Sequence, residues 1–351
     1  MKALRVLVVD DSAFSRVSIG KMLERDKRIK VVGYAVNGEE GLRKLLDLKP
    51  DVVTLDLEMP LMGGFSLLRL IMEQHPVPVI VVSSQSERQD VFKALELGAV
   101  DFVAKPARAK SSDLYDIEQD LIQKVCQAAP LRVDKLQRLR HEEVILPPTS
   151  AAPPLTRQHA AAVLIGASTG GPPALHHLFA SMKEQLPVPM AIAQHMPPGF
   201  TRSFAQRLHD CSVMEVKEAE DGEPMSPGKV LVCPGSKNME LHQLGGIVRV
   251  RISDPPAQQI YTPSVDVLFR TAANAYGPKT LGVVLTGMGN DGADGVREIA
   301  ERGGRILAEA EESCIIYGMP KEALLTGMVE KSVPLERMLL EIELRCRLKP
   351  D

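Results

Sequence analysis

The chain has 351 residues, which is long enough for two domains. Its 42 Lys and Arg against 45 Asp and Glu give a net charge of −3, which does not favour nucleic-acid binding. No apolar stretch approaches the roughly 20 residues that span a bilayer, and the start leads directly into a strand, so we expect neither a signal peptide nor membrane insertion. The five cysteines lie far apart without a C-x-x-C pair, which favours reduced thiols in a cytoplasmic protein.

Residues 1 to about 127 alternate short apolar runs with helical patterns, which predicts a doubly wound parallel α/β sheet with helices on both faces. The predicted strands are Arg5–Val9, Val31–Ala35, Val52–Leu55, Val79–Val82 and Phe102–Ala104. Helices are predicted near 14–26, 38–47, 64–74, 88–97 and 112–127. In such sheets the functional site lies at the carboxyl ends of the strands.

Polar side chains stand at four of these strand ends, namely Asp10, Asp11, Asp56, Ser83 and Lys105. Three carboxylates brought together repel one another and need a cation, and hard oxygen ligands suit Mg²⁺. Beside Mg²⁺ and Lys105, the Asp56 carboxylate is placed to attack a phosphoryl group, with Ser83 as a hydrogen-bond partner of a phosphoryl oxygen. A lone Asp or Ser is more often a cap or turn residue, but the combination of four strand ends predicts a phosphoryl site.

Three motifs here resemble the response-regulator receiver domain: VVDDS at 8–12, LDLEMP at 55–60 and GAVDFVAKP at 98–106. The resemblance implies a flavodoxin-like fold with a five-stranded parallel sheet, and Asp56 as the phospho-acceptor for a histidine kinase. It also implies Mg²⁺ bound by Asp10, Asp11, Asp56 and the backbone carbonyl of Glu58. Ser83, Phe102 and Lys105 would form the switch that responds to phosphorylation. A haloacid-dehalogenase-type phosphatase would need an Asp where Glu58 stands.

The alternation fails between about 128 and 158. Residues 132–143 are highly charged and compatible with a solvated helix, and residues 146–155 are rich in Pro, Ser and Ala. This composition is typical of a semi-rigid surface linker, with a Pro-rich recognition peptide as the less common alternative. We therefore predict a first domain over 1–127, a linker over 128–158 and a second domain over 159–351.

The second domain is expected to be another doubly wound α/β sheet. Its predicted strands are Val163–Ile165, Val188–Ala193, Val230–Val232, Ile247–Arg251, Thr280–Leu285 and Arg305–Ala308. Helices are predicted from about Pro172 to Lys183, from about Gly295 to Arg302, and over Leu335–Arg345.

Three of these strands lead into Ser168, His195 and Asp291. The turn GASTG at 166–170 matches the G-x-S-x-G nucleophile elbow, although a glycine turn of this kind also suits phosphate binding. Acyl transfer requires such a set, because a His must take the serine proton and an acid must orient the imidazole. The N–H of Thr169 and an N–H near Met288 are candidates for holding the oxyanion.

Other residues compete for these roles. Asp294 is the rival of Asp291, but its place further into the loop favours a role as the cap of the following helix. The chain order Ser, His, Asp differs from the Ser, Asp, His order of α/β-hydrolases, and the turn lacks the Gly-Lys of a P-loop. The less suitable histidines are His176 and His177, which lie on a predicted helix, and His209 and His242, which do not follow a buried strand into a glycine loop.

The motifs GASTGG at 166–171, QHMPPGFT at 194–201 and TGMGNDGA at 286–293 resemble the catalytic domain of the chemotaxis methylesterase CheB. The receiver, linker and catalytic domain also occur in that family's order. The resemblance implies Ser168 as nucleophile, His195 as base and Asp291 as orienting acid, with no cofactor for the ester reaction. It implies hydrolysis of glutamyl γ-methyl esters on chemoreceptors with release of methanol, and in many members deamidation of receptor glutamines.

Two other functions stay open at this point. A non-catalytic module could use the receiver to gate docking to a partner, and an esterase could act on a small metabolite ester.

The fusion of a receiver to a hydrolytic domain further suggests that the unphosphorylated receiver covers the Ser168 crevice.

Overall fold

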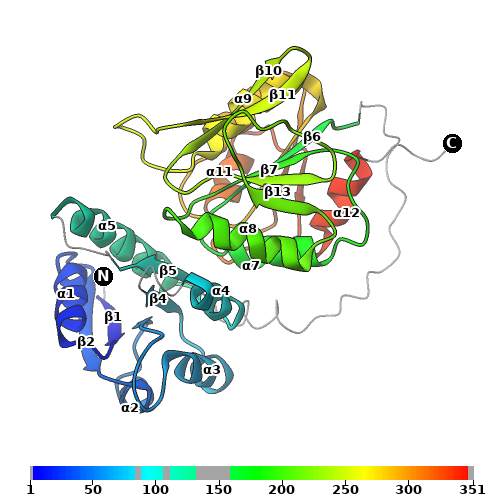
Figure 1. Ribbon diagram of the computed structural model, residues 1–351. Coiled ribbons are helices and arrows are strands. Elements are labelled where there is room, and N and C mark those ends of the chain that lie inside the picture. The colour runs from blue at the N-terminus through cyan, green and yellow to red at the C-terminus, as the bar shows by residue number, and fades with distance from the viewer. Residues whose placement is uncertain (1–2, 84–87, 106–110, 132–158, 347–351) are drawn as a thin grey trace. The chain divides into compact units, whose positions relative to one another are not determined.

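The computed structural model describes residues 3–83, 88–105, 111–131 and 159–346, and it divides into two compact units, Met1–His141 and Glu142–Asp351 (Figure 1). Each unit is an α/β domain built on a parallel sheet, as predicted. Most of the predicted linker, 132–158, lies outside the described residues. Among the described helices none is both long and apolar enough to cross a membrane.

The first unit is a five-stranded parallel sheet in the order β2-β1-β3-β4-β5. Its strands are β1 Leu4–Val9, β2 Ile29–Ala35, β3 Val52–Leu55, β4 Val79–Ser83 and β5 Asp101–Ala104. Its helices are α1 Ala13–Glu24, α2 Gly38–Leu48, α3 Gly64–Gln74, α4 Arg88–Glu96 and α5 Ser111–Ala128. The ten predicted elements are all present. Helix α1 packs with α5 and α2 packs with α3, so helices flank the sheet on its two faces.

The order of the strands in this sheet determines where its site lies. From β1 the chain moves outward to β2 and then crosses back to β3, so the carboxyl ends of β1 and β3 lie beside each other at the point where the direction reverses. Open parallel sheets bind ligands in the crevice at this point.

The second unit is a seven-stranded parallel sheet in the order β14-β13-β12-β6-β7-β9-β8. Its strands are β6 Ala162–Ala167, β7 Met190–Gln194, β8 Glu215–Glu218, β9 Lys229–Val232, β12 Thr280–Val284, β13 Arg305–Glu309 and β14 Lys331–Val333. Its helices are α7 Gly171–Ala180, α8 Phe200–Cys211, α9 Val265–Tyr276, α10 Ala293–Glu301, α11 Met319–Leu325 and α12 Leu335–Cys346, with a 3₁₀ turn at Gly277–Lys279. Helix α7 contacts α8 and α12, whereas α10 contacts α9 and α11.

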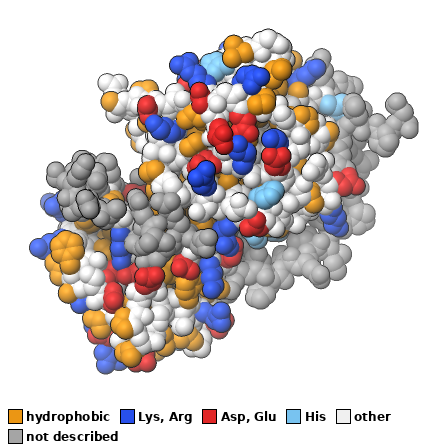
Figure 2. All heavy atoms as spheres, viewed as in Figure 1, with side chains coloured by type: hydrophobic (Ala, Val, Ile, Leu, Met, Phe, Trp, Pro, Cys, Tyr) orange, Lys and Arg blue, Asp and Glu red, His pale blue; other side chains and the backbone are white. Residues whose placement is uncertain are grey.

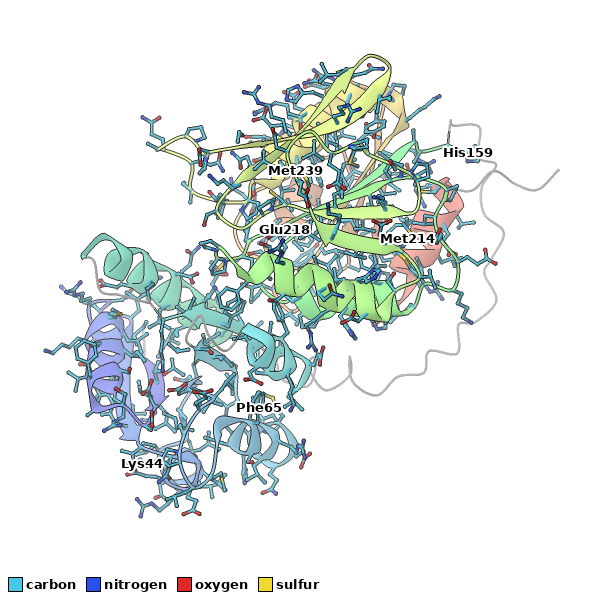
Figure 3. All side chains as sticks on the ribbon, in the orientation of Figure 1. Lys44, Phe65, His159, Met214, Glu218 and Met239 are labelled. Carbon is cyan, nitrogen blue, oxygen red and sulfur yellow. The ribbon has the colours of Figure 1, made fainter. Side chains whose placement is uncertain are left out.

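The strand predicted at Ile247–Arg251 is present, but it lies outside the main sheet. It forms β11, Ile247–Ser253, which pairs antiparallel with β10, Asn238–Leu244, in a separate two-stranded hairpin. The turn between them is Gly245-Gly246, and both glycines have positive φ, as a tight hairpin turn requires. The hairpin is tied to the domain through Met239 on β10, which is buried in the hydrophobic core (Figure 3).

Strand β6 lies in the middle of the second sheet, between β12 and β7, and all six of its residues are buried. Gly166 pairs with Val284 of β12, and Ala167 pairs with Gln194 of β7. Because the three strands are parallel and in this register, their carboxyl ends meet at one edge of the sheet. The loops that follow them therefore start side by side.

Figure 2 shows acidic and basic side chains interspersed over the visible faces of both units. This mixture agrees with the nearly balanced composition of the chain.

Candidate active site

Ser168 lies on a rigid turn between β6 and α7. Its N–H donates to the carbonyl of Thr286 (3.1 Å), and its own carbonyl accepts from the N–H of Gly171 (2.7 Å). Gly170 has φ +80°, a conformation that a side chain disfavours, and a Cβ there would lie 2.7 Å from Cβ of Ile315. The turn places Ser168 directly after the end of β6 and before α7, as the sequence predicted.

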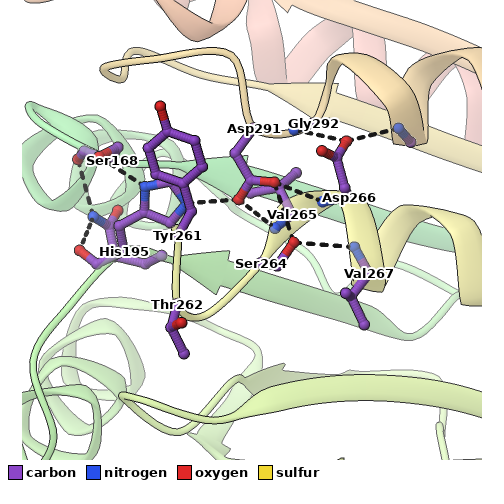
Figure 4. Close-up of polar contacts among 12 residues, drawn as sticks. Ser168, His195, Tyr261, Thr262, Ser264, Val265, Asp266, Val267, Asp291 and Gly292 are labelled. Atoms are coloured by element: carbon purple, nitrogen blue, oxygen red, sulfur yellow. Dashed lines mark hydrogen bonds and ion pairs between the residues drawn. The ribbon is translucent and has the colours of Figure 1, made fainter. Parts of the chain in front are cut away.

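His195 connects Ser168 with Asp291 (Figure 4). Its Nδ1 lies 3.1 Å from Oγ of Ser168, and its Nε2 lies 2.7 Å from Oδ2 of Asp291. A carboxylate can only accept a hydrogen bond, so Nε2 carries the proton and Nδ1 presents its lone pair to the serine hydroxyl. The three predicted side chains are thus brought together in the arrangement that a general base requires.

The Asp291 carboxylate also binds the first turn of α9. It accepts from the backbone N–H of Val265 (2.7 Å) and Asp266 (3.0 Å) and from the hydroxyl of Ser264 (3.2 Å). Burial alone would raise the pKa of Asp291, but the interactions with His195 and with these N–H groups outweigh it and hold the pKa below its usual value. Asp291 therefore stays ionised and fixed in position.

Asp266 is an acidic residue of this site that the sequence analysis missed. Its Oδ1 accepts from the N–H of Gly292 (2.9 Å) and of Gly295 (2.7 Å) at the start of α10. Asp291, just before α10, thus binds the start of α9, and Asp266, in α9, binds the start of α10. Burial and then repulsion from Asp291 raise the pKa of Asp266 to about 7. The available signal was an acid two residues after Ser264, at the start of an apolar helical pattern.

The prediction that Asp294 caps α10 is wrong. The residue at the cap position is Gly292, and the Asp294 side chain is 82% exposed and pairs with Arg297. Asp266 supplies the carboxylate from another helix instead, because α9 and α10 pack together at their first turns.

The loop that carries Met288 lies across from the nucleophile. A Cβ on Gly287 would lie 2.9 Å from Cβ of Ser168, and the Gly287 carbonyl accepts from the N–H of Gly318 (3.1 Å) and Met319 (2.9 Å). This double hydrogen bond fixes the Gly287–Met288 segment next to Ser168.

The backbone at Thr169 is fixed by a hydrogen bond from Thr286, which is itself bound to a buried carboxylate. The hydroxyl of Thr286 donates to the Thr169 carbonyl (3.0 Å), and the N–H of Thr286 donates to the fully buried carboxylate of Glu309 (2.7 Å). The two predicted oxyanion donors, Thr169 and Met288, therefore lie on segments that hydrogen bonds hold in place near Ser168.

The competing histidines lie away from Ser168. His176 and His177 are on α7, and burial lowers the pKa of His177. His209 accepts from the N–H of Val216 (3.3 Å), and His242 pairs with Glu240 on the hairpin (2.9 Å).

The predicted phosphoryl site is assembled at the carboxyl ends of β1, β3 and β5. Oxygens of Asp10, Asp11 and Asp56 lie within 4.8 Å of one another. Nζ of Lys105 lies 2.6 Å from Asp56 and 2.9 Å from Asp10. Burial would lower the pKa of Lys105, but its hydrogen bonds with Asp56 and Asp10 outweigh this and raise it, so the lysine stays charged. An all-carboxylate set of hard oxygen donors, two of them buried, fits Mg²⁺.

The other predicted receiver residues surround this cluster. Ser83 ends β4 and is buried, and its carbonyl accepts from the N–H of Lys105 (2.7 Å). Phe102 is buried on β5 and packs edge-on against Phe92, with ring centroids 6.5 Å apart. The side chain of Glu58 is exposed, in the loop after β3.

The fold and the two sites define a class of protein in which a receiver-type α/β unit precedes an α/β unit with a Ser–His–Asp arrangement at adjacent strand ends. Residues 6–115 match the family model described as the response regulator receiver domain, and residues 163–342 match that of the CheB methylesterase. The chain therefore belongs to the CheB methylesterase family.

Individual relatives agree with this assignment. Protein-glutamate methylesterase/protein-glutamine glutaminase 3 of Geobacter sulfurreducens is 48% identical over the whole of both chains. A relative of the same description from Myxococcus xanthus is 44% identical, over 95% of this chain and 94% of its own. The crystal structure of the Thermotoga maritima CheB methylesterase catalytic domain is 37% identical with a TM-score of 0.51, covering 53% of this chain and 98% of that one.

Proposed function

We propose that this chain hydrolyses glutamyl γ-methyl esters of chemoreceptors to glutamate and methanol, and deamidates receptor glutamines, under control of its receiver domain. The observation that carries the proposal is His195, which contacts both Oγ of Ser168 and Oδ2 of Asp291. Relatives that match all or nearly all of the chain are named for both activities. The substrate would be the part of the receptor in the cytoplasm.

The reaction begins when Oγ of Ser168 attacks the ester carbonyl carbon and its proton passes to Nδ1 of His195. The proton on Nε2 stays in its hydrogen bond to Asp291, which stabilises the imidazolium. The carbonyl oxygen becomes an oxyanion held by the N–H groups of Thr169 and Met288, each worth about 10²–10³ in rate.

The intermediate then collapses, and the Nδ1 proton goes to the methoxy oxygen as methanol leaves. Water attacks the acyl-enzyme with His195 again as base, and the carboxylate product and the free Ser168 hydroxyl are regenerated. A glutamine side chain follows the same steps with ammonia as the leaving group.

In the receiver we propose Asp56 as the phospho-acceptor and a chemotaxis histidine kinase as the donor. Asp10, Asp11, Asp56 and the Glu58 carbonyl would hold Mg²⁺, which offsets the negative charge of an incoming phosphoryl group. Lys105, Ser83 and Phe102 would form the switch. The proposed organisation is a receiver over 1–127, a linker over 128–158 and a catalytic domain over 159–351, with the unphosphorylated receiver restraining catalysis.

The test is methanol release from methyl-esterified receptor, with and without Mg²⁺ and acetyl phosphate. We expect release to rise with the phosphodonor, to vanish in Ser168→Ala and to stop responding in Asp56→Asn. Removal of residues 1–150 should raise the basal rate. An output that survives Ser168→Ala would indicate a binding module, and release from small esters but not from receptor would indicate a different esterase.

A further inference from the structure

The ring of Tyr261 lies flat against the ring of His195 (Figure 4). Their centroids are 5.2 Å apart and their planes differ by 5°, which is a stacked arrangement. We propose that Tyr261 is a positioning residue for His195, which holds the imidazole in line with Ser168 and stabilises its charged form. The inference rests on the proposed function, because it assigns a role toward the same general base.

The two hydrogen bonds of His195 leave one motion of its ring unrestrained. They act at Nδ1 and Nε2, in the plane of the ring, and so define an axis about which the ring can still tilt. The Nδ1 lone pair points slightly off this axis, so a tilt swings it away from the line to Oγ of Ser168. A flat aromatic surface against the imidazole face supplies the third contact and blocks this tilt.

The other end of Tyr261 lies against the loop that carries Met288. A Cβ built on Gly289 would lie 2.3 Å from the Tyr261 hydroxyl oxygen, so the tyrosine occupies the space that a side chain would need. Gly289 also has φ +83°, which favours glycine. One side chain thus contacts both the base and the segment proposed to bind the oxyanion.

The segment around Tyr261 is itself fixed by a pair of amide side chains. Nε2 of Gln259 donates to the Tyr261 carbonyl (2.7 Å) and to Oδ1 of Asn238 (2.9 Å), and Nδ2 of Asn238 donates back to Oε1 of Gln259 (2.8 Å). Oδ1 of Asn238 also accepts from the N–H of Ser264, at the cap of α9 (3.2 Å). Asn238 is buried at the start of β10, so the hairpin outside the main sheet helps to place Tyr261.

The stacked ring also suits the change in charge during the reaction. When His195 takes the serine proton, the imidazolium faces the electron-rich surface of the tyrosine ring, and a cation in that position is stabilised. The contact is then stronger in the charged state than in the resting state, which is the condition for lowering a barrier.

The experiment compares the full-length parent chain with Tyr261→Phe, Tyr261→Ala and Ile260→Ala, using methanol release from methyl-esterified receptor in the presence of Mg²⁺ and acetyl phosphate. Ile260 is the adjacent residue and is 85% exposed, so it controls for disturbance of the segment. We expect kcat to fall about five- to thirtyfold in Tyr261→Ala, which corresponds to about 1–2 kcal/mol. In Tyr261→Phe, which keeps the ring, and in Ile260→Ala kcat should stay within about twofold of the parent.

The histidine ring resonances supply a readout that does not depend on turnover. The His195 ring protons, assigned by comparison with His195→Gln, should shift in Tyr261→Ala because the neighbouring ring current is lost, and should stay in place in Ile260→Ala. A Tyr261→Ala chain with parental kcat would overturn the inference, as would Tyr261→Phe falling as far as Tyr261→Ala. A parent chain that releases no methanol would instead refute the proposed function and the role inferred from it.

Discussion

Replacing Asp291 by Asn tests the proposed mechanism most sharply, because the change keeps the shape of the side chain. Oδ2 of Asp291 accepts from His195 and from the N–H of Val265, and Oδ1 accepts from the N–H of Asp266. An amide has only one acceptor oxygen, so in either orientation its NH₂ group faces a buried backbone N–H at 2.7 or 3.0 Å. One such unsatisfied donor costs about 1–3 kcal/mol of folding free energy.

The orientation of the new amide determines the loss of activity. With its NH₂ group toward His195, the imidazole must carry its proton on Nδ1, and it can no longer accept the proton of Ser168. A wrong tautomer of this kind lowers kcat by about 10⁴, or about 5.5 kcal/mol. The opposite orientation keeps the tautomer and the hydrogen bond but makes its acceptor neutral. Hydrogen bonds to charged groups contribute about 1.5–3 kcal/mol and neutral ones about 0.5–1.5 kcal/mol, so kcat should fall by about tenfold.

The assay is methanol release by Asp291→Asn together with a urea titration of its unfolding. Asp294→Asn is the matched control, because its side chain is exposed three residues further along and should leave both quantities unchanged. A folded Asp291→Asn chain that retains more than about a third of the parental kcat would refute the assignment of the acid, since even the milder orientation requires a tenfold loss.

Three other substitutions test the Met288 loop, the ion pairs of Glu330 and the proposed Mg²⁺ site. In Gly318→Ala a Cβ would lie 2.6 Å from the Gly287 carbonyl oxygen, so the Met288 loop must shift and kcat should fall by about 10²–10³, the cost of one oxyanion donor; parental kcat in that variant would contradict the role of the loop. Glu330 accepts hydrogen bonds from Arg305 and Arg345. Burial alone would raise the pKa of Glu330, but these two contacts outweigh it and lower the pKa to about 2. The stabilisation is therefore present above about pH 4.5 and lost as the pH falls toward 2. Because the Glu330 side chain is 26% exposed, Glu330→Gln should remove about 1–2 kcal/mol at pH 7 and flatten the acid dependence of urea unfolding; an unchanged acid dependence would contradict this. Asp11→Asn should shift the response to acetyl phosphate to higher Mg²⁺ concentrations, and an unchanged Mg²⁺ titration would argue against that carboxylate as a ligand.

The receiver could be predicted almost completely from the sequence, because four of its five strands are short, largely buried runs that end in or lead into a polar residue. Parallel strands buried on both faces are continuous apolar segments, and Val52–Leu55 and Val79–Ser83 are clear cases. The Ser168, His195 and Asp291 positions were predictable for the same reason, since each follows a buried strand of the second sheet.

The parts that were missed depend on packing between distant segments. The hairpin of β10 and β11 is only partly buried, and its short apolar runs do not tell whether it joins the main sheet. The capping of α10 by Asp266 depends on how α9 packs against it. The stacking of Tyr261 on His195 likewise depends on the path of the chain after the hairpin. Helix α9 was also not predicted, but it could have been. Its buried residues follow a helical spacing that is visible in the sequence.

The starts of α9 and α10 are linked by two carboxylates, so the hydrogen bonds of four backbone amides depend on each other. The N–H groups of Val265 and Asp266 bind Asp291, and those of Gly292 and Gly295 bind Asp266. If the two helix starts separate, all four amides lose their acceptors at once, and the Asp291 carboxylate moves away from Nε2 of His195. The four amides should therefore exchange with deuterium at a common rate, as one cooperative opening unit, and that rate would measure how often the Asp291 carboxylate is away from His195.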